Sequence, residues 1–154
     1  MISKTTLLIQ LWKEARTRFA NQLSTLSEAD LRKTLPPAPN SVGFLIRHIG
    51  DVELLFAKNV FKAEDVKVRA KTVIAQRDTG IWTNLDELIE YTARSFKTLL
   101  AIVEMQTDSD WETIVNTKEF GTKTKAEAFG RIISHTNHHA GQMVLLIKYG
   151  IDNN

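Results

Sequence analysis

Four long segments in which apolar residues recur every three or four positions are the strongest constraint on the fold of this chain. That spacing matches the turn of an α-helix, whereas the strict alternation typical of strands is scarce. The segments predict helices at roughly residues 4–26, 41–60, 83–106 and 124–149. Each helix can bury its apolar stripe only against the others, so the sequence predicts an all-α fold, a four-helix bundle.

Residues that favour helix ends support these boundaries. Asn40 and Ser41 are both good N-caps for the second helix, and Thr124 with Glu127 forms a capping box for the fourth. Gly150 is a natural residue to follow the last helical turn. The links are longer than simple antiparallel neighbours need, so they leave room for a crossover connection. The first link is kept non-helical by three prolines, Pro36, Pro37 and Pro39.

Length and composition narrow the class of protein. The 154 residues show no internal repeat, which predicts one domain spanning residues 1–154. A net charge of +2 gives no electrostatic footprint for nucleic acid. The chain has no cysteine, so it cannot form a disulfide, a cysteine zinc site or a cysteine nucleophile. No apolar run approaches the roughly 20 residues that span a bilayer, and the N-terminus lacks a signal-peptide pattern. We therefore expect a cytoplasmic protein without a membrane partner.

Three of the four histidines fall within five residues, in the stretch RIISHTNHHAGQ of the last predicted helix. Two of them share a stripe of the kind that faces a bundle core, whose members are Ala128, Ile132, His135, His139, Gln142, Leu146 and Tyr149. On the second predicted helix, His48 lies in a similar stripe between Leu45 and Val52. Residues four apart on a helix have Cβ atoms about 5–6 Å apart. Both imidazoles of the pair can therefore reach one ion.

A metal site and a polar core are the two interpretations of these histidines. A single histidine on an apolar face is more often a hydrogen-bonded core residue, which remains the alternative for His48. The pair favours a metal, because an unsatisfied buried polar group costs about 1–3 kcal/mol and one ion satisfies both rings. The sequence thus predicts His135 and His139 as ligands and His48 as the third. His138, about 100° further round the helix, and Gln142 are candidates to hydrogen-bond these ligands.

Other catalytic motifs are missing from the sequence. It contains no H-E-x-x-H, no Glu-x-x-His, no G-x-S-x-G and no P-loop. Asp51 and Glu53 are the carboxylates nearest to His48 along the chain, and we interpret both as part of a solvated helix face. No catalytic residue or general base is assigned. Gly141 in mid-helix costs about 1 kcal/mol relative to alanine, which predicts close helix packing at that point.

Two stretches resemble a known family. They are NSVGFLIRHIGDVE at residues 40–53 and HTNHHAGQ at residues 135–142, with a third helix between them. Together they resemble the DinB-like superfamily of metal-binding four-helix bundles, which also includes bacillithiol transferase-like proteins. The resemblance spans nearly the whole chain. It implies an up-down-down-up helix order, a zinc or nickel ion on His48, His135 and His139, and a homodimer. Many relatives carry an arginine where this chain has Ala140, so the role of that arginine is not carried over.

The site suggests three functions. Three neutral imidazoles leave a coordination position open, as in catalytic zinc sites, and such an ion lowers the pKa of bound water or thiol. Because the chain has no cysteine, any thiol must come from outside. The resemblance implies transfer of a low-molecular-weight thiol to an electrophilic small-molecule substrate, so the first hypothesis is a metal-dependent S-transferase or isomerase. The second is a metal-dependent hydrolase. The third is a non-catalytic metal-binding or stress-related bundle.

Overall fold

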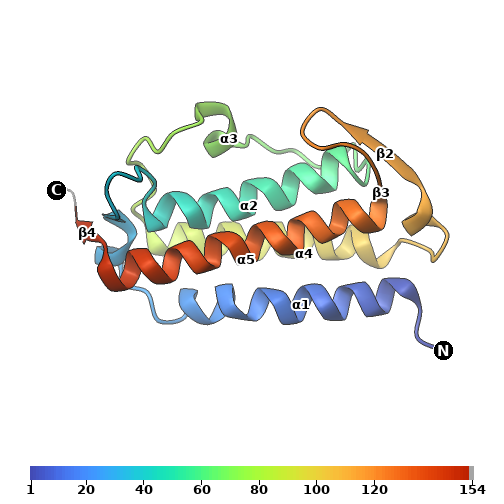
Figure 1. The fold of residues 1–154 in the computed structure, drawn as a ribbon, viewed down its shortest axis with the longest axis horizontal. Helices are drawn as coiled ribbons and strands as arrows, with labels where there is room; N and C mark the ends of the chain where they lie inside the picture. Colours follow the sequence, from blue (N-terminus) through green and yellow to red (C-terminus); the bar gives the residue numbers. More distant parts are fainter. Residues whose placement is uncertain (153–154) are drawn as a thin grey trace.

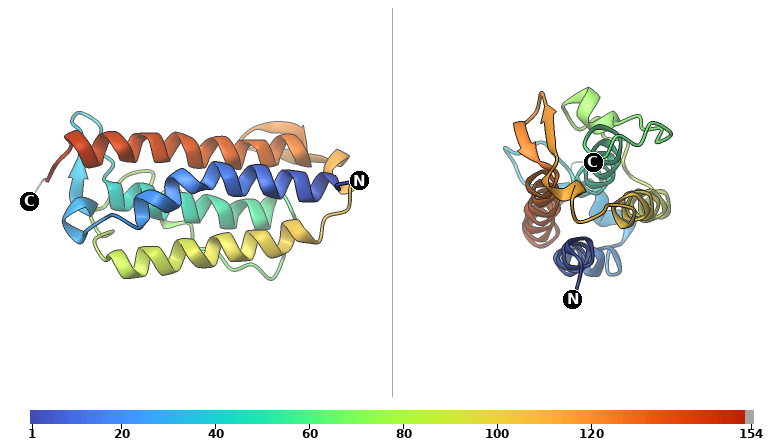
Figure 2. Two further views of the ribbon diagram at one scale, coloured as in Figure 1. Left: turned by 90° about the horizontal axis from the view of Figure 1, so that it is seen from below. Right: turned by 90° about the vertical axis from the view of Figure 1, so that its right-hand side faces the viewer.

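A computed structural model describes residues 1–152 and contains four long helices (Figure 1). They are α1 (Lys4–Leu23), α2 (Val42–Asn59), α4 (Leu85–Glu104) and α5 (Lys125–Tyr149). Seen end-on in Figure 2, α1 lies opposite α2 and α4 lies opposite α5, and each helix packs against its two neighbours. The predicted all-α bundle is confirmed. Within the described residues, no helix is both long enough and apolar enough to cross a membrane.

Contacts near the helix ends give the direction of each helix. α1 begins beside the end of α4, where the Thr5 hydroxyl donates to the Gln106 carbonyl at 2.6 Å. It ends beside the later half of α5, where the Gln22 side-chain amide donates to the Ala140 carbonyl at 3.0 Å. α1 and α5 therefore run one way, and α2 and α4 run the other way, as the colours of Figure 1 show.

The links, and the residues after α5, contain short elements that the helical period does not predict. Three are helical turns: η1 (Glu28–Arg32), α3 (Lys71–Ala75) and η2 (Asp110–Glu112). Four are short strands: β1 (Lys33–Thr34), β2 (Ile114–Thr117), β3 (Gly121–Thr124) and β4 (Ile151–Asp152). β2 and β3 form an antiparallel hairpin, and β1 pairs antiparallel with β4. The hairpin turn packs on α2, with the rings of Phe56 and Phe120 stacked at 6.0 Å.

The helix boundaries follow from local hydrogen bonds. The Ser41 and Thr124 hydroxyls cap α2 and α5, as predicted. α4 begins at Leu85, two residues after the predicted start at 83, because the Asn84 side chain caps it by accepting from the Glu87 backbone N–H. α1 stops three residues before its predicted end. There the Ser24 and Thr25 hydroxyls donate to carbonyls of the last turn, which satisfies those groups without further helix.

The core consists of two apolar clusters with buried and half-buried polar residues between them. One cluster gathers around Trp12 and Phe129, the other around Phe19 and Met143. We call the residues between them the central polar layer; it comprises Arg16, His48, Asp51, Glu53, Tyr91, Ser95, His135 and His139. It crosses all four helices, since α1, α2, α4 and α5 each contribute to it.

An ion pair anchors this layer on the side away from the histidines. Arg16 Nε donates to Glu53 Oε1 at 2.8 Å, and Arg16 Nη2 donates to the Thr92 carbonyl at 3.2 Å. The Ser95 hydroxyl donates to Glu53 Oε2 at 2.6 Å. Asp51 and Glu53 are both 0% exposed, so their interpretation as a solvated helix face is wrong. The reason is tertiary: α4, α5 and the link that carries α3 cover α2 on nearly every side.

Glycine at position 43 permits the link before α4 to lie against α2. A Cβ at Gly43 would come within 1.9 Å of the Trp82 carbonyl oxygen, which belongs to the backbone and cannot rotate away. We expect Gly43→Ala to lower the free energy of unfolding by about 1–3 kcal/mol, measured by urea denaturation.

Gly141→Ala is the matched control, since no atom lies within 4 Å of a Cβ built there. The close packing predicted at Gly141 is therefore wrong, and alanine should stabilise the helix by up to about 1 kcal/mol. Equal effects of the two substitutions would contradict this assignment.

Candidate metal centre

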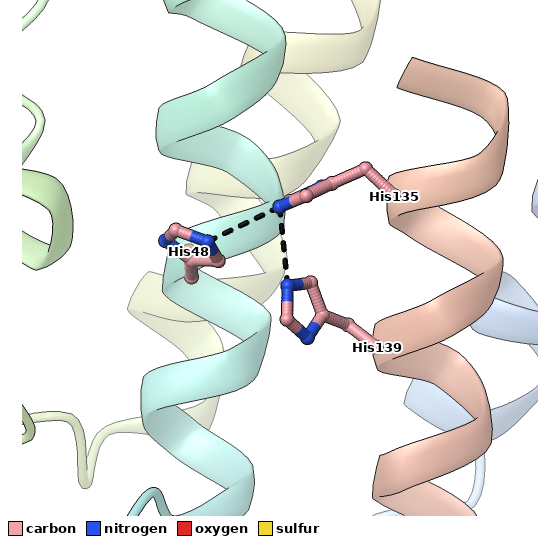
Figure 3. Close-up of side chains that lie close together, drawn as sticks. All are labelled: His48, His135 and His139. Atoms are coloured by element: carbon pink, nitrogen blue, oxygen red, sulfur yellow. Dashed lines mark hydrogen bonds between the residues drawn. The ribbon is translucent and has the colours of Figure 1, made fainter. Parts of the chain in front are cut away.

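Three histidines point toward one another across the gap between α2 and α5 (Figure 3). His135 Nε2 lies 3.1 Å from His48 Nε2 and 3.1 Å from His139 Nε2. The three ligand atoms that they offer all lie within 4.8 Å of one another. The structure thus brings together the three residues that the sequence singled out, from positions 87 residues apart along the chain.

The cluster lies at the edge of the core and not at its centre. The buried face of α5 consists of Ala128, Phe129, Ile132, Thr136, Ala140, Met143 and Leu146. His135, His139 and Gln142 run along one side of this face and are half-buried, while Tyr149 is exposed. The predicted stripe was therefore rotated by a fraction of a turn. Its polar members lie where the core meets solvent, so the cluster can be reached from outside.

A groove of about 270 Å³ opens beside the cluster. His135 lines it, together with residues of α2, α5 and the β2–β3 hairpin turn: Val52, Phe56, Glu119, Arg131, Ser134 and His138. A small molecule in this groove would lie next to His135, one of the three clustered histidines.

The hydrogen bond of His139 defines which ring nitrogen carries the proton. His139 Nδ1 lies 2.7 Å from Gln142 Oε1. An amide oxygen only accepts, so Nδ1 is the N–H and Nε2 presents a lone pair toward the cluster. Gln142 is thus hydrogen-bonded to a candidate ligand, in the place that the sequence indicated.

His48 is oriented by a residue that the sequence did not single out. Its Nδ1 lies 3.0 Å from the Thr72 hydroxyl oxygen, in α3. That hydroxyl donates its proton to Asp51 Oδ2 at 2.7 Å, so its oxygen accepts from His48 Nδ1–H. His48 Nε2 therefore also presents a lone pair to the cluster, and the carboxylate, hydroxyl and imidazole form one relay.

Asp51 is held by hydrogen bonds at both oxygens. Oδ2 also accepts from the Thr72 backbone N–H at 3.0 Å. Oδ1 accepts from Arg47 Nε at 2.9 Å and from the Tyr91 hydroxyl. Burial and the neighbouring Asp51 carboxylate raise the pKa of Tyr91, so its hydroxyl remains protonated as a donor. Asp51 is thus a fixed acceptor with no lone pair left facing the groove.

The third ring, His135, has no partner for one nitrogen. Its Nδ1 is buried and makes no hydrogen bond with any described residue. The Nε2 lone pairs of His48 and His139 both face His135 Nε2, and one N–H could satisfy only one of them. A cation at the point of convergence would satisfy all three lone pairs. Nitrogens bound at about 2.0–2.1 Å to a tetrahedral zinc ion lie about 3.3 Å apart. The two distances from His135 Nε2, both 3.1 Å, are close to this value, and the ligand atoms of His48 and His139 lie within 4.8 Å of each other. The donor set therefore fits a divalent ion such as zinc or nickel.

The protonation states also suit a metal. Burial, with the other histidines nearby, lowers the pKa of His135 to about 3, and burial lowers the pKa of His139 to about 4. Burial lowers the pKa of His48 as well, against the opposing charge of Asp51. All three rings are thus mainly neutral near pH 7, which is the state that binds a metal ion.

His138 differs from the other three histidines. It is exposed, its ring centroid lies 5.1 Å from that of His139, and within residues 1–152 it forms no hydrogen bond to the cluster. It lines the groove instead. Its predicted role as a hydrogen-bond partner of the ligands is therefore not supported by a hydrogen bond among residues 1–152, although its ring lies edge-on to that of His139.

The relay predicts that Thr72 controls metal affinity without touching the metal. Thr72→Val removes the hydroxyl but keeps the shape of the side chain, so His48 Nδ1 loses its acceptor. We expect divalent metal affinity to fall about 10–100-fold, measured by competition with a chromophoric chelator. Thr72→Ser, which restores the hydroxyl, should recover most of the affinity. An unchanged affinity in Thr72→Val would show that the relay does not orient His48.

Comparisons with solved structures reproduce the fold. A DinB-like protein from Bacillus cereus is 18% identical with a TM-score of 0.72, covering 96% of this chain and 94% of that chain. A conserved protein from Enterococcus faecalis is 16% identical with a TM-score of 0.70, covering 96% and 97%. A mutant of mycothiol-dependent maleylpyruvate isomerase is 16% identical with a TM-score of 0.65, covering 93% of this chain and 63% of that longer chain. No protein of curated function gives a match.

The sequence itself identifies the family. The family model described as the DinB superfamily matches residues 11–143, a range that contains all four long helices in whole or in part and the three clustered histidines. The chain therefore belongs to the DinB superfamily.

Proposed function

We propose that this protein is a metal-dependent transferase that uses a low-molecular-weight thiol on an electrophilic small-molecule substrate. The observation that carries the proposal is the convergence of three imidazole lone pairs beside an open groove, in a chain without cysteine. His48, His135 and His139 would hold a zinc or nickel ion. When bound, such an ion lowers the pKa of a coordinated thiol or water.

The residues of the chain contribute position and access. The three histidines approach from α2 and α5, and His135 also lines the groove through which an external ligand would reach the site. Thr72 and Gln142 hold two of the rings in place. Val52 and Phe56 give the groove an apolar wall against which the carbon skeleton of a substrate can pack. The thiol dependence of the isomerase that shares this fold supports a thiol here.

A hydrolase is the less favoured alternative. A metal-dependent hydrolase normally has a general base, often a carboxylate, beside the attacking water. Asp51 is the nearest carboxylate to His48 along the chain, yet both of its oxygens already accept hydrogen bonds, which leaves Glu119 of the groove as the carboxylate that such a mechanism would use. The ranking below thiol transfer therefore rests on the thiol dependence of the isomerase that shares this fold. A non-catalytic bundle would not require a groove next to the cluster. The cytoplasmic location, the homodimer and the single domain spanning residues 1–154 stay predictions.

Thiol transfer to an activated aryl chloride tests the proposal. With zinc-loaded protein and mercaptoethanol, sulfur should form the new bond to carbon while chloride leaves and the thiol proton passes to solvent. We expect thioether formation above the uncatalysed rate, and its loss in His139→Ala. Conversion that proceeds equally without thiol would overturn the proposal in favour of hydrolysis, and no acceleration under any condition would favour the non-catalytic alternative.

A further inference from the structure

Two opposite charges face the groove beside His135. Arg131 lies on α5 one turn before His135, and Glu119 lies in the turn between β2 and β3. The groove therefore joins the candidate metal centre to a cation from one element and an anion from another.

Aromatic packing positions the arginine. Its guanidinium carbon lies 5.1 Å from the centroid of the Phe120 ring, and that ring stacks on Phe56 of α2. The Phe120 backbone N–H donates to the Thr117 hydroxyl at 3.2 Å, which braces the hairpin turn. A guanidinium held over a ring keeps its N–H groups free for a ligand carboxylate.

Neither charge is neutralised within the protein. Among residues 1–152, Arg131 and Glu119 form no ion pair and no hydrogen bond, with each other or with any other residue. A ligand with a single negative charge would gain from Arg131 but would be repelled by Glu119. A ligand that carries both a carboxylate and an ammonium group would satisfy both side chains.

We propose that Arg131 and Glu119 bind the carboxylate and the ammonium group of a zwitterionic thiol, with its sulfur directed toward the histidine cluster. The carbon chain of the thiol, between its sulfur and its charged groups, packs against the apolar wall formed by Val52 and Phe56. This inference rests on the proposed function, because it names the class of thiol for that same site. The step is binding alone, so no bond is made or broken by these two residues.

Thiol binding to cobalt-loaded protein tests the assignment independently of turnover. Three simple thiols test the contribution of each side chain in turn. Apart from the sulfur, mercaptopropionate carries a negative charge, cysteamine carries a positive charge and mercaptoethanol carries none. The thiolate-to-cobalt charge-transfer band reports the Kd of each. We expect Arg131→Gln to raise the Kd of mercaptopropionate about five- to tenfold and to leave the Kd of mercaptoethanol unchanged. Glu119→Gln should raise the Kd of cysteamine and lower the Kd of mercaptopropionate.

Arg18→Gln is the matched control, because it removes the same charge from an exposed position on α1, outside the groove. It should leave all three Kd values within twofold of the parent protein. If Arg131→Gln and Glu119→Gln change the three thiols equally, or not at all, the inference is overturned while the thiol function stands. If no thiol gives the band with the parent protein, the proposed function fails, and this inference fails with it.

Discussion

Metal binding should be lost when alanine replaces His135. This ring contributes the nitrogen that lies 3.1 Å from both of the others, so its removal leaves two ligands on separate helices. We expect the affinity for zinc or nickel to fall by more than about 100-fold, beyond the range for loss of an outer hydrogen-bond partner. Elemental mass spectrometry of protein purified without a histidine tag, with chelator competition, measures the change.

His138→Ala supplies the control from the same helix. It removes one imidazole next to the cluster, but this ring is exposed and makes no hydrogen bond to the candidate ligands in the described part of the chain. It should retain about one ion per chain. An equal loss in both variants, or an ion retained in His135→Ala, would refute the three-histidine site. The apoprotein of His135→Ala should remain folded, because the substitution also removes a buried nitrogen that has no partner.

The largest loss of stability should follow from Glu53→Ala. This change leaves Arg16, a residue only 9% exposed, without its counter-ion inside the bundle. Breaking one side of a buried pair typically costs about 3–5 kcal/mol, because the remaining charge stays desolvated. Urea denaturation followed by circular dichroism should show this loss with an unchanged slope.

The double variant Arg16→Met with Glu53→Leu distinguishes a buried charge from lost packing. Replacing both partners by apolar residues removes the stranded charge, so most of the stability should return. A loss below about 1 kcal/mol in Glu53→Ala alone would match an exposed pair and contradict the burial of this ion pair.

Much of this architecture is encoded locally, which is why sequence reasoning reached it. The caps at Ser41 and Thr124 act within one helical turn, and the spacing of His135 and His139 places both rings on one side of a helix whatever surrounds it. The grouping of His48 with this pair followed from the same periodicity in a second helix. These features require no knowledge of which elements meet in space.

The remaining parts of the site depend on tertiary contacts that leave no periodic signal. Thr72 lies in an irregular link and reaches His48 only because that link folds along α2. Asp51 resembles a surface carboxylate in sequence, and only the covering of α2 by its neighbours buries it. The edge position of the histidines was missed for a similar reason, because a three- and four-residue spacing does not distinguish the middle of a buried face from its border.

The central polar layer has a consequence for how the helices are aligned along their axes. A bundle with a uniformly apolar core can slide by one turn, about 5.4 Å, and still bury similar surface. Here such a slip of α1 would carry Arg16 away from Glu53 and set a bare charge against the apolar clusters. The free-energy cost of an unpaired buried charge disfavours the slipped arrangement. The ion pair therefore fixes the register of α1 against α2, the helix that carries His48.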